Sequence, residues 1–246
     1  MSSYYHSLAP FRDLFATGNP VLTYHKLGPR PAGARLKGLY VSTALFTRQL
    51  AELRAAGFGS GTLDQCGAGR TAPQIVITFD DGFENVLRHG LQPLAENRFR
   101  AIQFLVADRL GGVNEWEQAE GEKPERLMDA AQIREWLAAG HTIGSHTLTH
   151  PRLTQLSPAA AREEIVASKQ RLEDTFGRAV EHFCYPYGDW NEAVRDLVIA
   201  AGYRTACTVQ PGVNPPGTSP FELQRFTARY ASRNLKSLWR WLQGKS

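Results

Sequence analysis

The sequence predicts an α/β fold in which strands and helices alternate along the chain. Short apolar runs end in glycine, proline or acidic residues and are separated by stretches with helical spacing, which is the pattern of parallel βαβ units. Seven strands are expected, at 20–25, 74–79, 101–107, 141–145, 182–185, 203–208 and 223–228. Seven parallel strands favour an incomplete barrel or an open doubly wound sheet.

Capping residues mark the ends of the predicted helices. Ser42 or Thr43 caps a helix that Gly57 ends, because a hydroxyl accepts the first free N–H groups and glycine tolerates the left-handed turn after a helix. Ser157 caps another helix, which has Pro158 in its first turn. The helices after the first are expected at 83–97, 128–139, 158–176, 191–201 and 235–242.

The composition excludes several classes of protein. The 28 Lys and Arg residues against 24 Asp and Glu give a formal charge of +4, but the basic residues are scattered, so no nucleic-acid-binding arm is indicated. Three cysteines without C-x-x-C spacing argue against a disulfide framework and a cysteine-ligated zinc site. No apolar run reaches the ~18 residues of a membrane helix, and residues 1–19 lack the pattern of a secretory signal. A cytoplasmic protein is therefore expected.

Two adjacent carboxylates, Asp80 and Asp81, follow the predicted strand at 74–79 and precede Gly82. The carboxyl ends of parallel strands are where α/β proteins build their sites, and neighbouring strand residues point to different sides. Two like charges this close repel unless a cation or a shared proton compensates them. The structural alternative is a helix N-terminus with acidic residues in its first turn.

Two histidines, His146 and His150, follow the predicted strand at 141–145. Imidazoles four positions apart can meet in one turn and bind one metal ion. Pro151 disfavours helix at His150 and indicates a tight turn instead. Two ordinary surface or core histidines are the alternative.

Further polar or aromatic residues end other predicted strands. In Phe183–Gly188, proline and glycine around Tyr187 fix a turn that can aim a backbone N–H at an oxyanion, or that only packs aromatic side chains. His25 ends the first strand. Each motif alone has a structural explanation. Together, one aspartate and two histidines supply three metal ligands with room for water, and the second aspartate is left free as a base.

The order T-F-D-D-G at 78–82, H-T-L-T-H at 146–150 and P-Y-G at 186–188 resembles the motifs of the polysaccharide deacetylase family, carbohydrate esterase family 4. The resemblance covers roughly residues 73–230 and implies a distorted (β/α)7 barrel. It also implies that Asp80 is the catalytic base and that the backbone N–H of Tyr187 helps to hold the oxyanion. The ligands of one divalent metal, most commonly zinc, would be Asp81, His146 and His150.

We therefore predict one catalytic domain over residues 1–246. It comprises an N-terminal strand, loop and helix at 1–72, a deacetylase core at 73–230 and a closing helix at 231–246. The L-T-Y-H segment at 22–25 and the helix after it also resemble the N-terminal part of relatives associated with exopolysaccharide synthesis.

Two positions depart from the family pattern. Many relatives have an arginine, paired with the catalytic aspartate, where this chain has Cys184. Many also have a late Leu-x-His whose histidine is the general acid, but here the matching residues are 223–225 and end in Arg225. No histidine follows His182. His25 is the strand-end histidine left to serve as the acid, and Arg225 is placed to orient Asp80 instead.

The predicted function is metal-dependent hydrolysis of N-acetyl groups on a hexosamine-containing poly- or oligosaccharide. Four aromatic residues are candidates for stacking on sugar rings, namely Trp116, Tyr185, Tyr187 and Trp190. Two alternatives stay open: a C–N hydrolase acting on a small non-sugar amide, and a glycan-binding protein with a degenerate site. The expected partner is an N-acetylated glycan, and neither nucleic acid nor a membrane span is expected.

Overall fold

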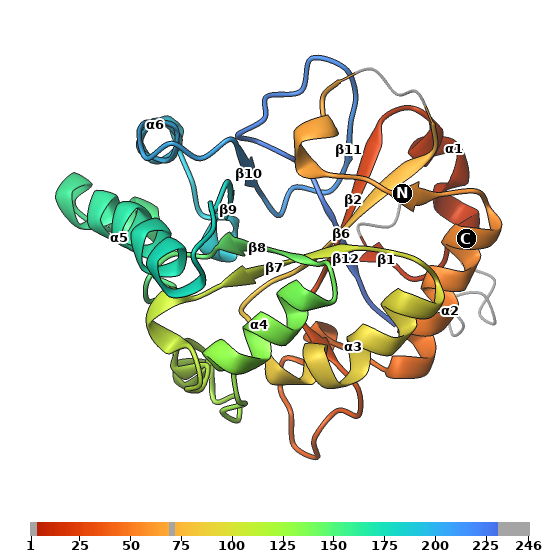
Figure 1. The fold of residues 1–246 in the computed structure, drawn as a ribbon, viewed down its shortest axis with the longest axis horizontal. Helices are drawn as coiled ribbons and strands as arrows, with labels where there is room; N and C mark the ends of the chain where they lie inside the picture. The colour runs from red at the N-terminus through yellow and green to blue at the C-terminus, as the bar shows by residue number, and fades with distance from the viewer. Residues whose placement is uncertain (1–3, 69–71, 231–246) are drawn as a thin grey trace, which may run out of the picture.

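The computed structural model describes residues 4–68 and 72–230 and is built around one curled sheet (Figure 1). The strand order is β1-β12-β2-β6-β7-β8-β9-β10, with β11 and β5 attached to β2 and β6, while β3 and β4 form a separate pair. The strands are β1 (Tyr4–Tyr5), β2 (Asn19–Tyr24), β3 (Lys26–Leu27), β4 (Tyr40–Val41), β5 (Gly59–Ser60), β6 (Gln74–Phe79), β7 (Ala101–Leu105), β8 (Thr142–Ser145), β9 (His182–Cys184), β10 (Thr205–Cys207), β11 (Val213–Asn214) and β12 (Phe226–Ala228).

The sheet closes into a distorted barrel. All neighbours from β12 through β2, β6, β7, β8 and β9 to β10 are parallel. At the seam, Cys207 of β10 forms a single parallel bridge with Leu223, three residues before β12 begins. The seven predicted strands are present, and the predicted distorted (β/α)7 barrel is confirmed; the open doubly wound sheet is not formed.

Helices cover the outside of this barrel. In Figure 1, α2, α3 and α4 lie along one side of the sheet, and α5 and α6 lie next to each other on another side. As predicted, the Ser42 hydroxyl accepts a hydrogen bond from Leu45 N–H at the start of α2, and Ser157 caps α5 in the same way. The helices are α1 (Arg12–Ala16), α2 (Thr43–Ala55), α3 (Glu84–Glu96), α4 (Ala130–Ala138), α5 (Pro158–Phe176) and α6 (Glu192–Ala200).

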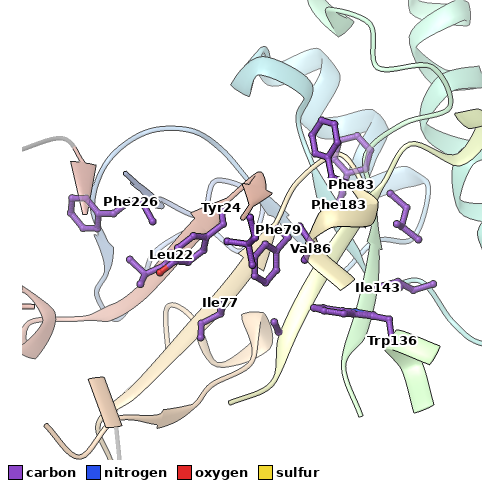
Figure 2. Close-up of a cluster of buried hydrophobic side chains, with 14 of the residues drawn as sticks. Leu22, Tyr24, Ile77, Phe79, Phe83, Val86, Trp136, Ile143, Phe183 and Phe226 are labelled. Carbon is purple, nitrogen blue, oxygen red and sulfur yellow. The ribbon is translucent and has the colours of Figure 1, made fainter. Parts of the chain in front are cut away.

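The two faces of the sheet carry separate apolar clusters. Leu22, Tyr24 and Phe79 point outward against the helices, where Phe79 meets Trp136 of α4 edge to face with ring centres 6.0 Å apart (Figure 2). Alternate residues of the same strands form the second cluster inside the barrel, from Val21, Val76, Ile102, Phe104, Cys184, Cys207 and Leu223. This period of two fixes which strand-end side chains face the barrel axis.

Two segments for which no strand or helix is predicted contain regular structure. The segment after β2 forms β3, which pairs with β4. The loop at 108–127 contains a 3-10 helix at Glu115–Glu120 and short antiparallel bridges, including one between Val113 and Arg126. The predicted helix at 235–242 and the rest of 231–246 lie outside the described residues. In the part of the chain that is described, no helix is long and apolar enough to cross a membrane.

Candidate active site

The carboxyl ends of the barrel strands meet at a cleft of about 440 Å³. Most of the predicted site residues line it, because parallel strands bring their last residues to the same end of the sheet. These are His25 after β2, Asp80 and Asp81 after β6, His146 and His150 after β8, and Tyr187 after β9. Arg225 is fully buried beside this cleft, where it contacts Asp80.

Arg225 and Asp80 form a two-pronged ion pair. The guanidinium donates from Nη1 to Oδ1 and from Nη2 to Oδ2, both over 2.8 Å. The second N–H of Nη1 is shared between the Thr23 and Thr78 hydroxyls, and Nε–H donates to the Thr208 carbonyl. Such a fork fixes both the position and the plane of a carboxylate, which a lysine cannot do.

The charge of Arg225 keeps Asp80 ionised in spite of burial. Burial by itself would raise the pKa of Asp80, but the positive charge and hydrogen bonds of Arg225 outweigh it and hold the pKa well below its usual value. Asp80 is therefore an anion at neutral pH, with a fixed orientation at the end of β6. A carboxylate in this state can accept a proton.

Cys184 lies where many relatives carry the arginine that contacts the base. Its Sγ is 3.1 Å from Nη2 of Arg225 and 3.7 Å from Oδ2 of Asp80. The space beside Asp80 is thus filled by a guanidinium that enters from the residue before β12 instead of from β9. The contact between Arg225 and Asp80 is the one expected if Arg225 orients Asp80. The catalytic role of Arg225 stays a prediction.

Asp81, His146 and His150 bring three ligand atoms together. Oδ1 of Asp81 is 3.5 Å from Nε2 of His146 and 3.4 Å from Nε2 of His150, and all three side chains are buried. Two ligands at about 2.0–2.1 Å from a tetrahedral zinc ion lie roughly 3.3–3.4 Å apart. The separations therefore suit one small divalent cation.

The hydrogen bonding of His146 supports the same assignment. Its Nδ1 is 2.7 Å from the Cys184 carbonyl, which can only accept, so Nδ1 carries the proton. Burial lowers the pKa of His146, so the ring is neutral and its Nε2 presents a lone pair to the Asp81 carboxylate. Two acceptors that face each other across 3.5 Å repel unless a cation or a proton lies between them, and a metal ion bound by both would remove this repulsion. Burial, with Glu117 and Asp80 nearby, raises the pKa of Asp81, which reflects the same uncompensated charge.

A second trio, Asp80, His146 and Cys184, also lies within ligand distance. Here the carboxylate and the sulfur are already in contact with the Arg225 guanidinium. A permanent cation occupies the position that a metal would take, so the trio with Asp81 is the better metal site.

Left-handed backbone conformations place the site residues. The φ angles of Asp81, His150 and Tyr187 are 76°, 68° and 59°. Non-glycine residues adopt such angles at an energetic cost, and they concentrate at functional sites. The turn of 186–188 that the proline and glycine predict is a 3-10 turn with Tyr187 at its centre.

Aromatic rings form the wall beside the candidate metal ligands. Trp116 stacks on the His150 ring at 4.6 Å, and Tyr187 meets the same ring edge to face at 4.5 Å. Trp116, Tyr185 and Tyr187 line the cleft, as the sequence predicts for sugar-stacking residues. Trp190 is not among the lining residues and stacks on Tyr185 with ring centres 5.8 Å apart.

His25 lies next to the proposed base. Its Nε2 is 3.9 Å from Oδ2 of Asp80. Burial lowers the pKa of His25 to about 4, and the nearby Asp80 only partly opposes this. The ring is therefore neutral at pH 7, and it has to receive a proton before it can donate one.

Sequence reasoning did not identify a buried ion pair at the edge of the cleft. Lys26 Nζ is 2.7 Å from Glu117 and 3.5 Å from Glu125, with no exposed surface on the lysine. The ammonium also lies over the Tyr40 and Phe83 rings. Glu117 adjoins Trp116, which the sequence indicated as an aromatic candidate, but no pattern indicated that Lys26 would be buried.

The comparison with known protein families identifies the chain. The model of the family described as polysaccharide deacetylase matches residues 68–206, more than half of the sequence. The chain belongs to the polysaccharide deacetylase family. The predicted resemblance is thereby confirmed, and the matched range includes Asp80, Asp81, His146, His150 and Tyr187.

Matches between this deacetylase and known relatives or solved structures cover different shares of the two chains. A chitooligosaccharide deacetylase of Bradyrhizobium sp. (strain ANU 289) is 27% identical over 130 residues, 52% of this chain and 52% of that protein. The chain spans about half the length of the curated relatives it matches. Streptococcus pyogenes deacetylase PplD, solved with acetate, has a TM-score of 0.75 at 20% identity and covers 90% of this chain and 97% of its own. IcaB from Ammonifex degensii has a TM-score of 0.74 at 24% identity, and the match covers 92% of this chain and 97% of IcaB. These two likenesses establish the fold.

Proposed function

We propose that the protein is a metal-dependent hydrolase that removes N-acetyl groups from a hexosamine-containing poly- or oligosaccharide. The observation that carries this proposal is the pairing, in one cleft, of an Arg225-bound carboxylate with an Asp–His–His ligand set. A base next to a cation site can hydrolyse an unactivated amide, because the cation stabilises the developing charge and the base activates water.

Asp81, His146 and His150 would hold one divalent ion, and the mixture of nitrogen and oxygen donors favours zinc. When bound, this ion polarises a carbonyl group and makes water easier to deprotonate. The chain prepares the ligands in advance: Cys184 carbonyl fixes the His146 tautomer, and Trp116 packs on the His150 ring.

Asp80 would accept the proton of the attacking water. Arg225 keeps the carboxylate ionised and sets its plane, so the lone pairs that remain face the cleft. As the carboxylate takes up the proton, its hold on Arg225 weakens, which favours passing the proton on.

The remaining groups would complete the reaction. The backbone N–H of Tyr187, in its left-handed turn, is assigned to the developing oxyanion. His25, 3.9 Å from Asp80, is assigned to protonate the departing amine. The proton it donates is the one that Asp80 has taken from water. Trp116, Tyr185 and Tyr187 offer ring faces to the sugar.

The test is acetate release from N-acetylated chitooligosaccharides, with and without a chelator, combined with metal analysis of the protein. The proposal predicts bound metal and acetate release that the chelator abolishes and added zinc restores. Bound metal without acetate would instead support hydrolysis of a non-sugar amide. Neither metal nor acetate would support a glycan-binding protein.

A further inference from the structure

One side of the cleft carries positive charge that the proposed chemistry does not use. Arg35, Lys37 and Arg229 line the same cleft as Asp80 and Asp81. Arg35 precedes a short 3-10 helix at Lys37–Leu39 in the segment between β3 and β4, Lys37 begins that helix, and Arg229 directly follows β12. Among the side chains that the structure describes, no carboxylate forms an ion pair with any of the three.

The acidic groups of the cleft are already compensated. Asp80 is neutralised by Arg225, and Glu117 by Lys26. Asp81 is assigned to a divalent cation in the proposed function. The charge of Arg35, Lys37 and Arg229 therefore remains in excess and faces whatever enters the cleft.

The chain around these cations fixes the backbone that carries Arg35 and Lys37, and it positions the side chain of Arg229. The Arg35 and Leu36 N–H groups donate to the buried Glu122 carboxylate over 2.8 and 2.5 Å, which fixes the backbone that carries Arg35 and Lys37. The Arg229 guanidinium lies 3.7 Å over the Tyr4 ring. A Cβ built on Gly38 would lie only 2.8 Å from the same guanidinium, so glycine at this position leaves room for Arg229 where it lies.

Arg229 also has an unsatisfied donor. Its Nε is buried and has no hydrogen-bond partner among the described residues. A buried N–H without an acceptor costs free energy that an anionic ligand oxygen can return.

The positive surface continues beyond the catalytic cleft. A second hollow of about 630 Å³ is lined by residues 30–35 and Lys37 and shares Arg35 and Lys37 with the first. Its lining contains Arg30 and no acidic residue. The charged residues that line this second hollow are therefore all basic, and a ligand that extends into it from the cleft meets a positive surface.

From this arrangement we infer that the substrate carries an anionic oxygen group, a carboxylate or a phosphate, next to its N-acetylated sugar, and that Arg35, Lys37 and Arg229 bind it. This inference rests on the proposed function for the identity of the reacting group. It names a substrate class that neutral chitooligosaccharides do not belong to.

The test compares three N-acetylated oligosaccharides of equal length: one neutral, one with a uronic-acid carboxylate beside the acetylated sugar and one with a phosphate monoester there. The measured quantity is the ratio of kcat/KM for each anionic substrate to that for the neutral one. It is measured for the wild type and for Arg35→Gln/Lys37→Gln. The matched control is Arg98→Gln/Arg178→Gln, which removes two exposed charges ahead of β7 and β9, at the opposite end of the barrel.

We expect the ratio to exceed one in the wild type, to fall about three- to tenfold in Arg35→Gln/Lys37→Gln, and to stay at the wild-type value in the control variant. Raising the salt from about 50 to about 500 mM should lower it as well, because exposed charges are then screened. The anionic substrate that gives the higher ratio identifies carboxylate or phosphate as the group. A ratio of one or less, with the neutral substrate deacetylated, overturns the inference and leaves the proposed function intact.

Binding separates failure of this inference from failure of the proposed function. Calorimetric titration of the same saccharides is carried out whether or not acetate is released. Salt-dependent binding of an anionic saccharide that Arg35→Gln/Lys37→Gln weakens, without acetate release from any substrate, supports the anion site and contradicts the proposed function. Equal binding of neutral and anionic saccharides contradicts the anion site whatever the activity.

Discussion

Arg225 donates a hydrogen bond of 2.8 Å to each carboxylate oxygen of Asp80. Arg225 directly precedes β12 and does not belong to β9. Cys184, on β9, contacts both partners through its sulfur. The position of a guanidinium beside the base is thus kept while the strand that supplies it differs from the pattern of many relatives.

Arg225→Lys should lower kcat/KM by about 10- to 100-fold, the usual effect of losing a group that orients a site residue. Lysine keeps the charge but cannot donate to both oxygens. Arg225 holds the pKa of Asp80 below its usual value, so its replacement should raise that pKa. Asp80 acts as the anion, and the acid limb of the pH–rate profile should therefore move to higher pH.

The pH–rate profile and metal content together check this prediction. A purely structural role would lower activity at every pH without moving the acid limb. Metal content should stay at the wild-type level, because Arg225 does not contact Asp81. An unmoved acid limb in a folded, metal-loaded variant would contradict the assigned role.

Lys26→Met should destabilise the protein by about 3–5 kcal/mol, because it leaves Glu117 buried without its cation. Adding Glu117→Gln to Lys26→Met should recover much of this loss, since the uncompensated charge is then gone. Urea unfolding of the two single variants and the double variant measures the coupling. Additive losses in the double variant would show that the pair does not stabilise the fold in this way.

Stability should fall as the pH decreases from about 6.5 to about 4, in part through His141. Burial lowers the pKa of His141 to about 4, and its Nδ1 accepts a hydrogen bond from Ala101 N–H while the ring packs on Trp136. The unfolded chain binds a proton at higher pH than the folded one, so the contribution of neutral His141 is present above pH 6.5 and lost as the pH falls through 4.

His141→Asn keeps an acceptor for Ala101 N–H but removes the titrating ring. Its free energy of unfolding should be lower at pH 7 and should change less between pH 6.5 and 4 than that of the wild type. Urea unfolding over this range makes the comparison. The same slope in both proteins would exclude His141 as a source of the pH dependence.

The sequence indicated for one physical reason that the Asp-Asp and His-x-x-x-His motifs meet, whereas the choice of Asp81 as the metal ligand came from the family resemblance. Parallel strands bring their carboxyl ends together, so polar motifs after the strands at 74–79 and 141–145 had to meet. The sequence did not establish the contact between Arg225 and Asp80. The contact depends on strand order, and the sequence does not show that β12 lies beside β2.

Other features depend on contacts that no local pattern encodes. The burial of Lys26 requires β3 to pair with β4 and a short helix at 115–120 to bring Glu117 over it. The stacking of Trp116 on His150 depends on the same helix. The left-handed φ angles of Asp81 and His150 arise in non-glycine residues, where sequence alone gives little warning.

The two aspartates divide the work in this account, and one crossed measurement tests that division most directly. Activity and bound metal are measured against zinc concentration for Asp80→Asn and Asp81→Asn. Asp80→Asn should bind metal normally and lose about 10²–10⁴-fold in kcat, without recovery at any zinc concentration, because no ion replaces a proton acceptor. Asp81→Asn should bind metal weakly and regain activity as zinc is raised, because an amide replaces a charged ligand. Rescue of Asp80→Asn by zinc, with normal metal binding in Asp81→Asn, would reverse the roles and contradict the mechanism.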